Sequence, residues 1–129
     1  MAFLFRNVLI VGAGGFIGAV LRYLVSGWAQ NLSKNGFFPV GTLSVNIAGC
    51  LLLGFLGGWS EHVRAVTPEV RLFLFIGILG SFTTYSTFSY ETMALFQDGG
   101  LTRGFLNIGL HIIIGLGSAF LGFSLSRYF

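Results

Sequence analysis

A dense group of hydroxyl side chains lies between residues 80 and 91 of this sequence. Eight of these twelve residues carry a hydroxyl, and Phe82, Tyr85 and Phe88 recur among them at intervals of three. Hydroxyls donate hydrogen bonds without carrying charge, and aromatic rings present a positive edge. No Lys or Arg lies in the run to hold an anion permanently. These groups, with the three rings on one helical face, can solvate a small anion and release it again, as conduction requires.

The same segment is a candidate for an interrupted helix. Gly77 and Gly80 lie just upstream of the hydroxyl run. An interruption frees backbone N–H and C=O groups, which at membrane depth must be buried in protein or line a wet cavity. Freed carbonyls can bind a cation, and freed amides an anion.

Other polar residues lie in otherwise apolar stretches. Asn46 can donate its amide to an anion or bond a neighbouring helix. Asn107 and His111 are four residues apart, so they share one face of a helix, and Ser118 lies about two turns further along. This face forms either a polar track or a set of interhelical hydrogen bonds.

Two charged residues flank these segments. Arg22 interrupts the first apolar stretch, where it either draws an anion into a vestibule or anchors the helix at the membrane interface. Glu91 follows the hydroxyl run, and we expect it to pair with a base or to cap the segment.

The composition determines which elements position these groups. Of the 129 residues, 54% are hydrophobic and 9% are charged, and the mean hydropathy is +0.85. A soluble domain carries about 25% charged residues, so a soluble enzyme is excluded. The basic residues are scattered, so we expect no nucleic-acid binding. Uncharged runs of 26, 19 and 23 residues cover 35–60, 72–90 and 104–126. We predict one all-α membrane domain over residues 1–129, with lipid-facing spans at 4–29, 40–60, 70–97 and 103–127.

The charges predict an ambivalent orientation. Four spans place four bases on one side and two or three on the other: Arg6, Arg64, Arg71 and Arg127 against Lys34, Arg103 and, where it reaches that interface, Arg22. This weak bias permits insertion in both directions. Four helices make a thin bundle, and together these features permit an antiparallel pair of chains.

An enzyme is not expected. His62 lies beside Glu61 in a connection without a Cys or paired carboxylates, and His111 has no metal-ligand partner at a suitable spacing. Cys50 is the one cysteine, so no intramolecular disulfide forms.

Three blocks of the sequence resemble the Fluc (CrcB) family of fluoride channels. Residues 80–89 followed by Glu91 resemble its third-helix signature, residues 14–23 its first-helix motif and residues 41–49 its second-helix motif. The blocks occur in the family's order, and the resemblance covers the whole chain. It departs at Tyr85, where the family more often has Phe, and at Ser81 and Phe82, which replace Gly-Leu.

The resemblance implies an antiparallel, dual-topology homodimer in the bacterial inner membrane that exports fluoride passively and confers fluoride resistance. It implies a structural Na⁺ at the dimer centre, held by the backbone carbonyls of Gly80 and Thr83. It also implies an ion pathway whose residues are Asn46, Tyr85, Ser86, Thr87, Phe88 and His111, with Arg22 at the vestibule.

Two other functions are compatible with a short four-helix membrane protein. A small proton-coupled multidrug exporter needs a carboxylate deep in the membrane, but the first span has none and Glu91 lies at the end of the uncharged run. A non-conducting assembly subunit predicts that Asn46 and Phe88 tolerate substitution by residues of similar size.

Overall fold

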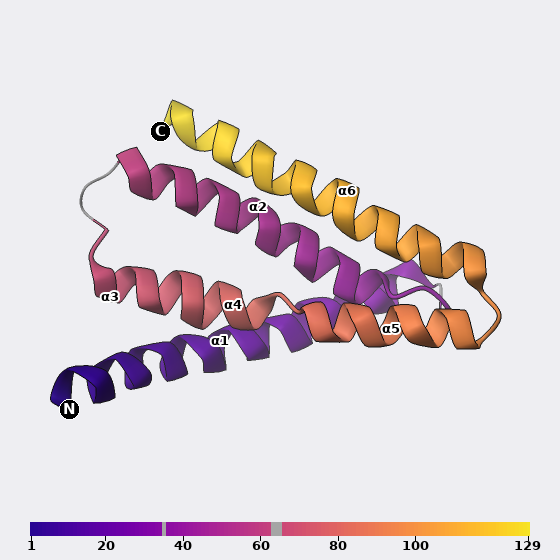
Figure 1. Ribbon diagram of the computed structural model, residues 1–129, viewed down its shortest axis with the longest axis horizontal. Helices are drawn as coiled ribbons and strands as arrows, with labels where there is room; N and C mark the ends of the chain where they lie inside the picture. The colour runs from indigo at the N-terminus through magenta and orange to yellow at the C-terminus, as the bar shows by residue number, and fades with distance from the viewer. Residues whose placement is uncertain (35, 63–65) are drawn as a thin grey trace.

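The computed structural model describes residues 1–34, 36–62 and 66–129, apart from the side chains of Ala2 and His62. Arg64, counted in the charge balance, and the His62 side chain therefore lie outside the described residues. The described chain is organised as helices joined by short connections (Figure 1).

Within the described residues, four helical segments are long and apolar enough to cross a membrane, which confirms the predicted number of spans. They cover Phe3–Ser33, Val40–Glu61, Pro68–Gln97 and Leu101–Tyr128. The first helix, α1 (Ala2–Ser33), extends four residues beyond its predicted end. It ends where Lys34 adopts a left-handed backbone conformation with φ 49°. The protein is a multi-pass membrane protein.

The remaining helices follow in chain order. After α2 (Val40–His62), the third span consists of α3 (Pro68–Arg71), the π-helix η1 (Leu72–Leu79), α4 (Gly80–Phe82) and α5 (Tyr85–Gln97). The fourth span consists of α6 (Leu101–Leu125) and the short 3₁₀-helix η2 (Ser126–Tyr128).

The helices pack in two pairs. In Figure 1, α2 lies along α6, whereas α1 crosses the η1–α4 segment. Both termini and the end of α2 lie at one end of the bundle, and the connection between α5 and α6 lies at the other. This arrangement is the one expected for four successive crossings.

Glycines bring the paired helices into close contact. A Cβ on Gly14 of α1 would meet the backbone of Phe73 and Gly77, and one on Gly122 of α6 would meet the backbone of Leu51. Small residues let helix backbones approach closely in membranes. These glycines therefore serve close helix packing, whereas Gly115 faces Cys50 at a looser 3.8 Å.

The third span is interrupted between α4 and α5. Thr83 and Thr84 are extended, with φ/ψ of −84°/156° and −151°/119°. The Thr84 hydroxyl accepts the backbone N–H of Thr87 and so caps α5. Because of this extended pair, Phe82 is buried at 7% exposure while Tyr85 is 80% exposed. The expectation that Phe82 shares a face with Tyr85 and Phe88 is therefore wrong.

Candidate functional site

Asn46 holds the extended backbone between α4 and α5. Its Oδ1 accepts the Thr84 N–H at 2.8 Å, and its Nδ2 donates to the Thr84 carbonyl at 3.1 Å. One amide from α2 thus satisfies both backbone groups that the interruption frees at Thr84.

Two carbonyls near the interruption lose their helical donors. In a continuous helix, the N–H groups of Thr84 and Thr87 would donate to the carbonyls of Gly80 and Thr83. Here the first donates to Asn46 and the second to the Thr84 hydroxyl, at 2.8 and 3.3 Å. Gly80 is exposed and Thr83 is half-buried. The carbonyls of Gly80 and Thr83 are therefore without their usual partners.

Beyond the interruption, rings from two helices contact one another. The centroids of Tyr85 and Phe88 on α5 are 5.7 Å apart, and those of Phe88 and His111 on α6 are 4.3 Å apart. All three rings are tilted relative to their neighbours, as edge-presenting aromatic pairs commonly are. Phe88 lies in the middle of this group.

A hydrogen-bond chain fixes the helices that carry these rings. Asn107 is fully buried, and its Nδ2 donates to the Thr92 hydroxyl at 2.9 Å. That hydroxyl donates to the Phe88 carbonyl at 2.7 Å. His111 contacts the Asn107 carbonyl through Nδ1 at 3.0 Å. The α5–α6 contact is therefore polar as well as aromatic.

Comparisons with known proteins show the family of this chain. The family model described as CrcB-like protein, Camphor Resistance (CrcB), matches residues 9–123. The chain belongs to the CrcB family. It is 46% identical to the "Fluoride-specific ion channel FluC" of Sulfurovum sp. (strain NBC37-1), over 93% of both chains. It is 45% identical to the protein of the same name from Oceanobacillus iheyensis, over 95% of this chain and 93% of the relative.

A third relative shows the same likeness. The chain is 46% identical to the "Fluoride-specific ion channel FluC 1" of Methanosarcina acetivorans, over 90% of this chain and 87% of the relative. The sequence-based resemblance to the CrcB family is therefore confirmed.

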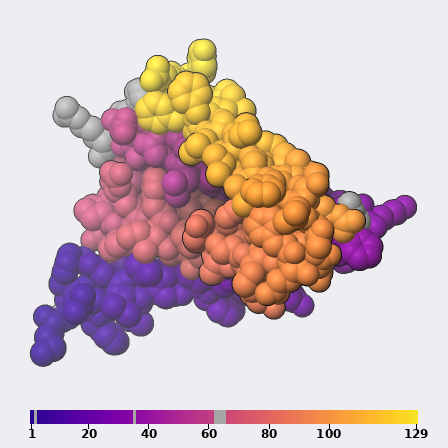
Figure 2. All heavy atoms as spheres, turned by 45° about the vertical axis from the view of Figure 1, so that its right-hand side comes forward, coloured from indigo at the N-terminus to yellow at the C-terminus, as the bar shows by residue number. Residues whose placement is uncertain are grey.

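In this CrcB family member, the hydroxyl run lies largely on the surface of the single chain. The Thr84 hydroxyl is 3.3 Å from that of Ser86 and 3.0 Å from that of Thr87. Ser86, Thr87 and Ser89 are exposed. In Figure 2, α5 and α6 form one continuous face in orange and yellow. We call Ser86, Thr87 and Ser89 the polar strip of α5. This strip lies beside apolar surface that suits lipid.

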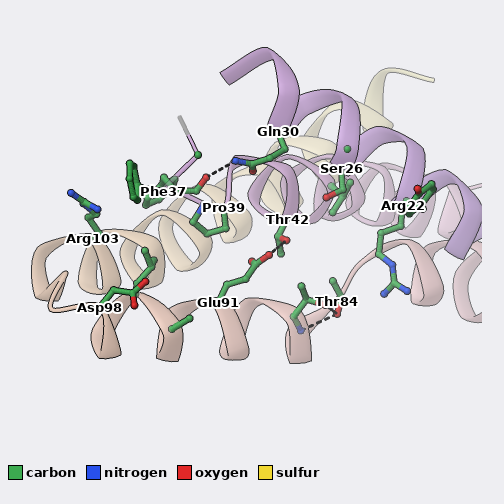
Figure 3. Close-up of a pocket in the computed structure, with 18 of the residues that line it drawn as sticks. Arg22, Ser26, Gln30, Phe37, Pro39, Thr42, Thr84, Glu91, Asp98 and Arg103 are labelled. Carbon is green, nitrogen blue, oxygen red and sulfur yellow. Dashed lines mark hydrogen bonds between the residues drawn. The ribbon is translucent and has the colours of Figure 1, made fainter. Parts of the chain in front are cut away.

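Arg22 lines a hollow of about 890 Å³ between α1, the start of α2 and α5. Thr42, Thr84, Thr87 and Glu91 line the same hollow. Figure 3 shows Arg22 extending into it from α1 and Glu91 extending from α5 toward Thr42. Among the described residues, the ion pair joins Arg6 to Glu69, so Arg22 has no carboxylate partner there.

Among the described residues Glu91 neither pairs with a base nor caps a helix, contrary to expectation. Its Oε1 accepts the Thr42 hydroxyl proton at 2.7 Å, and its Oε2 is buried without a hydrogen-bond partner in the described structure. Glu91 thus takes its hydrogen bond from an uncharged donor, the hydroxyl of the buried Thr42, which faces α5 from α2.

The structure thus places the predicted residues at four places. Asn46, Gly80 and Thr83 lie at the interruption, and Tyr85, Phe88 and His111 form the ring group. Ser86 and Thr87 lie on the polar strip, and Arg22 lies in the hollow. Sequence reasoning missed Thr42 and Thr92, which bond Glu91 and Asn107. Thr42 had a signal in the second-helix motif, whereas Thr92 follows the hydroxyl run without one.

Side chains alone make no metal centre here. Within residues 1–34, 36–62 and 66–129, no three His, Cys, Asp or Glu groups gather closely enough to hold a metal ion. The carbonyls of Gly80 and Thr83 are oxygen groups that have lost their helical donors at the interruption.

Proposed function

We propose that this chain is a fluoride-selective channel that lets fluoride leave the cell passively and thereby gives fluoride resistance. The observation that carries the proposal is the shared name of relatives that are 45–46% identical over about nine tenths of each chain. These relatives are named ion channels, and the chain is accordingly not an enzyme. The geometry supplies groups that suit the task.

The ring group and the polar strip form the proposed ion pathway. Tyr85 and Phe88 offer ring edges, while Ser86 and Thr87 offer hydroxyl donors within the same turns of α5. None of these groups carries a positive charge, so fluoride is solvated without being trapped. His111 packs against Phe88 and borders the pathway from α6.

Asn46 acts at the entrance to this pathway in a double role. One proton of its Nδ2 goes to the Thr84 carbonyl, and an amide nitrogen carries a second. The second proton is the one we assign to fluoride. The hydrogen bonds to Thr84 hold the amide in position, since they fix both of its polar atoms.

Arg22 serves the proposed vestibule. Its guanidinium extends into a hollow that is also lined by Thr84 and by Thr87 of the polar strip (Figure 3). Without a carboxylate partner in the described residues, its charge is available to raise the local fluoride concentration.

The polar strip supports an antiparallel homodimer of dual topology. Hydroxyls on an exposed face of a membrane helix would face hydrocarbon in a single chain, which is unfavourable. Tyr85 at 80% exposure and Ser86 beside it require a polar partner surface. A second copy, inserted in the opposite direction, presents the same strip and covers both, and lipid surrounds the apolar remainder.

A structural Na⁺ fits the interruption of the third span. The carbonyls of Gly80 and Thr83 would hold it, because both have lost their helical donors to Asn46 and Thr84. Carbonyl oxygens are hard ligands and suit such a cation. When bound, the ion would neutralise the carbonyl dipoles of two facing chains at the dimer centre.

A proton-coupled multidrug exporter is not supported, because none of the relatives named above is an exporter of that kind. Growth of fluoride-sensitive cells distinguishes a channel from a non-conducting assembly subunit. The parent chain restores growth in fluoride, whereas Asn46→Asp and Phe88→Ile, expressed at equal levels, do not. Full protection by both variants would contradict the channel.

A further inference from the structure

The imidazole of His111 has a fixed proton arrangement in its neutral form. Its Nδ1 lies 3.0 Å from the backbone carbonyl of Asn107. A carbonyl oxygen only accepts hydrogen bonds, so Nδ1 must carry the donated proton. In a neutral imidazole the other nitrogen then carries a lone pair and no proton. In neutral His111, Nε2 is therefore a hydrogen-bond acceptor.

That acceptor is buried without a partner. Within the described residues, Nε2 of His111 makes no hydrogen bond. The Asn107 side chain does not relieve it: Thr92 uses its proton on the Phe88 carbonyl, so the Asn107 amide must donate to Thr92, leaving its own Oδ1 a second buried acceptor. Two unpartnered acceptors one helical turn apart disfavour fluoride, which itself only accepts.

The proton on Nε2 therefore decides how His111 meets fluoride. The imidazole ring contacts the Phe88 ring at 4.3 Å, so it borders the place where fluoride passes that ring. With a proton from bulk water on Nε2, the ring offers an N–H donor and a positive charge there. Without it, the ring offers a lone pair, which repels an anion.

The titratable groups near His111 do not compete with it for this proton. On α5, Tyr85 lies beside Phe88, and Glu91 accepts its hydrogen bond from Thr42. On α2, the titratable group near this level of α6 is Cys50. No ion pair joins His111 to any of these groups within the described chain.

From this geometry we propose that His111 is a proton-dependent fluoride donor, so that fluoride passage in this chain accelerates as the imidazole becomes protonated. This inference rests on the proposed function. It predicts that fluoride and a proton bind together at His111, and that each raises the affinity for the other.

The first test measures fluoride efflux from liposomes at equal internal and external pH. The protonated fraction of the His111 imidazole rises as the pH falls from about 8 to about 6. We expect efflux, corrected for leak from protein-free liposomes, to rise at least about threefold over this range. His111→Asn keeps a donor for the Asn107 carbonyl but cannot titrate, so its efflux should not vary with pH. The control is His62→Asn, which removes the other histidine and should keep the dependence.

The second test does not depend on a folded variant. Fluoride added to the purified parent protein in weakly buffered detergent solution near pH 7 should cause proton uptake of up to one proton per chain, and chloride should cause none. Efflux that is independent of pH, an equal dependence in His111→Asn, or the absence of proton uptake would each overturn the proposal. Absence of fluoride efflux at every pH would instead contradict the channel function itself.

Discussion

Replacing Asn46 by Ala should destabilise the interruption between α4 and α5. The substitution removes both hydrogen bonds to Thr84, at 2.8 and 3.1 Å, and leaves a backbone N–H and C=O without partners. Each unsatisfied group costs about 1–3 kcal/mol when buried. Because Thr84 is only half-buried, we expect a total loss of about 2–4 kcal/mol in the free energy of unfolding.

Chemical unfolding in mixed detergent micelles measures this loss. Ser44→Ala is the matched control, because Ser44 lies on the same helix and makes no side-chain hydrogen bond in the described structure; it should change stability by less than about 0.5 kcal/mol. Asn46→Asp adds a second comparison. Its ionised carboxylate still accepts from the Thr84 N–H but repels the Thr84 carbonyl, so its deficit should shrink as pH falls and the carboxyl becomes a donor. If Asn46→Ala unfolds like Ser44→Ala, the assignment of Asn46 as the support of this segment is wrong.

Three further predictions concern packing, the pathway and the vestibule. Gly122→Ala should lower the free energy of unfolding by about 1–3 kcal/mol, because the added Cβ meets the α2 backbone, whereas Gly117→Ala enters open space and should be neutral; equal stabilities would refute the close contact. Phe88→Ile should reduce fluoride efflux from liposomes about tenfold through loss of its ring edge. Phe96→Ile, reconstituted in the same amount, should keep an efflux rate within about twofold of the parent chain. Equal efflux rates of the two variants would exclude the Phe88 ring as a pathway element. Arg22→Gln should reduce efflux about threefold at low ionic strength and much less near 1 M salt, where the Debye length is about 3 Å; a reduction that salt does not change would contradict electrostatic attraction.

The elements of this protein are predictable from its sequence because charges interrupt the apolar runs near their ends. The four spans follow from that pattern, and the largest shift is at the end of α1, which continues four residues past its predicted end at residue 29 to Ser33. The hydroxyl run likewise identifies the polar part of the third span. Both features are local, so a single sequence carries them.

The partners of the polar groups are not predictable in this way. Asn46 meets Thr84 across 38 positions of sequence, and Thr42 meets Glu91 across 49. Which donor faces which acceptor depends on the axial shift and rotation of packed helices, and glycine contacts between backbones set both. Sequence spacing defines a face of one helix but not the residue opposite it.

The extended pair at Thr83 and Thr84 shows the same limit. The glycines and hydroxyls indicate an interruption, but the side of the chain to which each ring turns depends on the backbone angles there. For this reason Phe82 joins the core while Tyr85 turns outward.

The most direct test of the central claim is anion efflux from liposomes that contain the purified chain. Vesicles loaded with equal concentrations of fluoride and chloride, with potassium and valinomycin to balance charge, are followed with electrodes specific for each anion. The account predicts that fluoride leaves faster than from protein-free vesicles while chloride does not. Fluoride efflux equal to that of protein-free vesicles, or equal acceleration of both anions, would contradict a fluoride-selective channel.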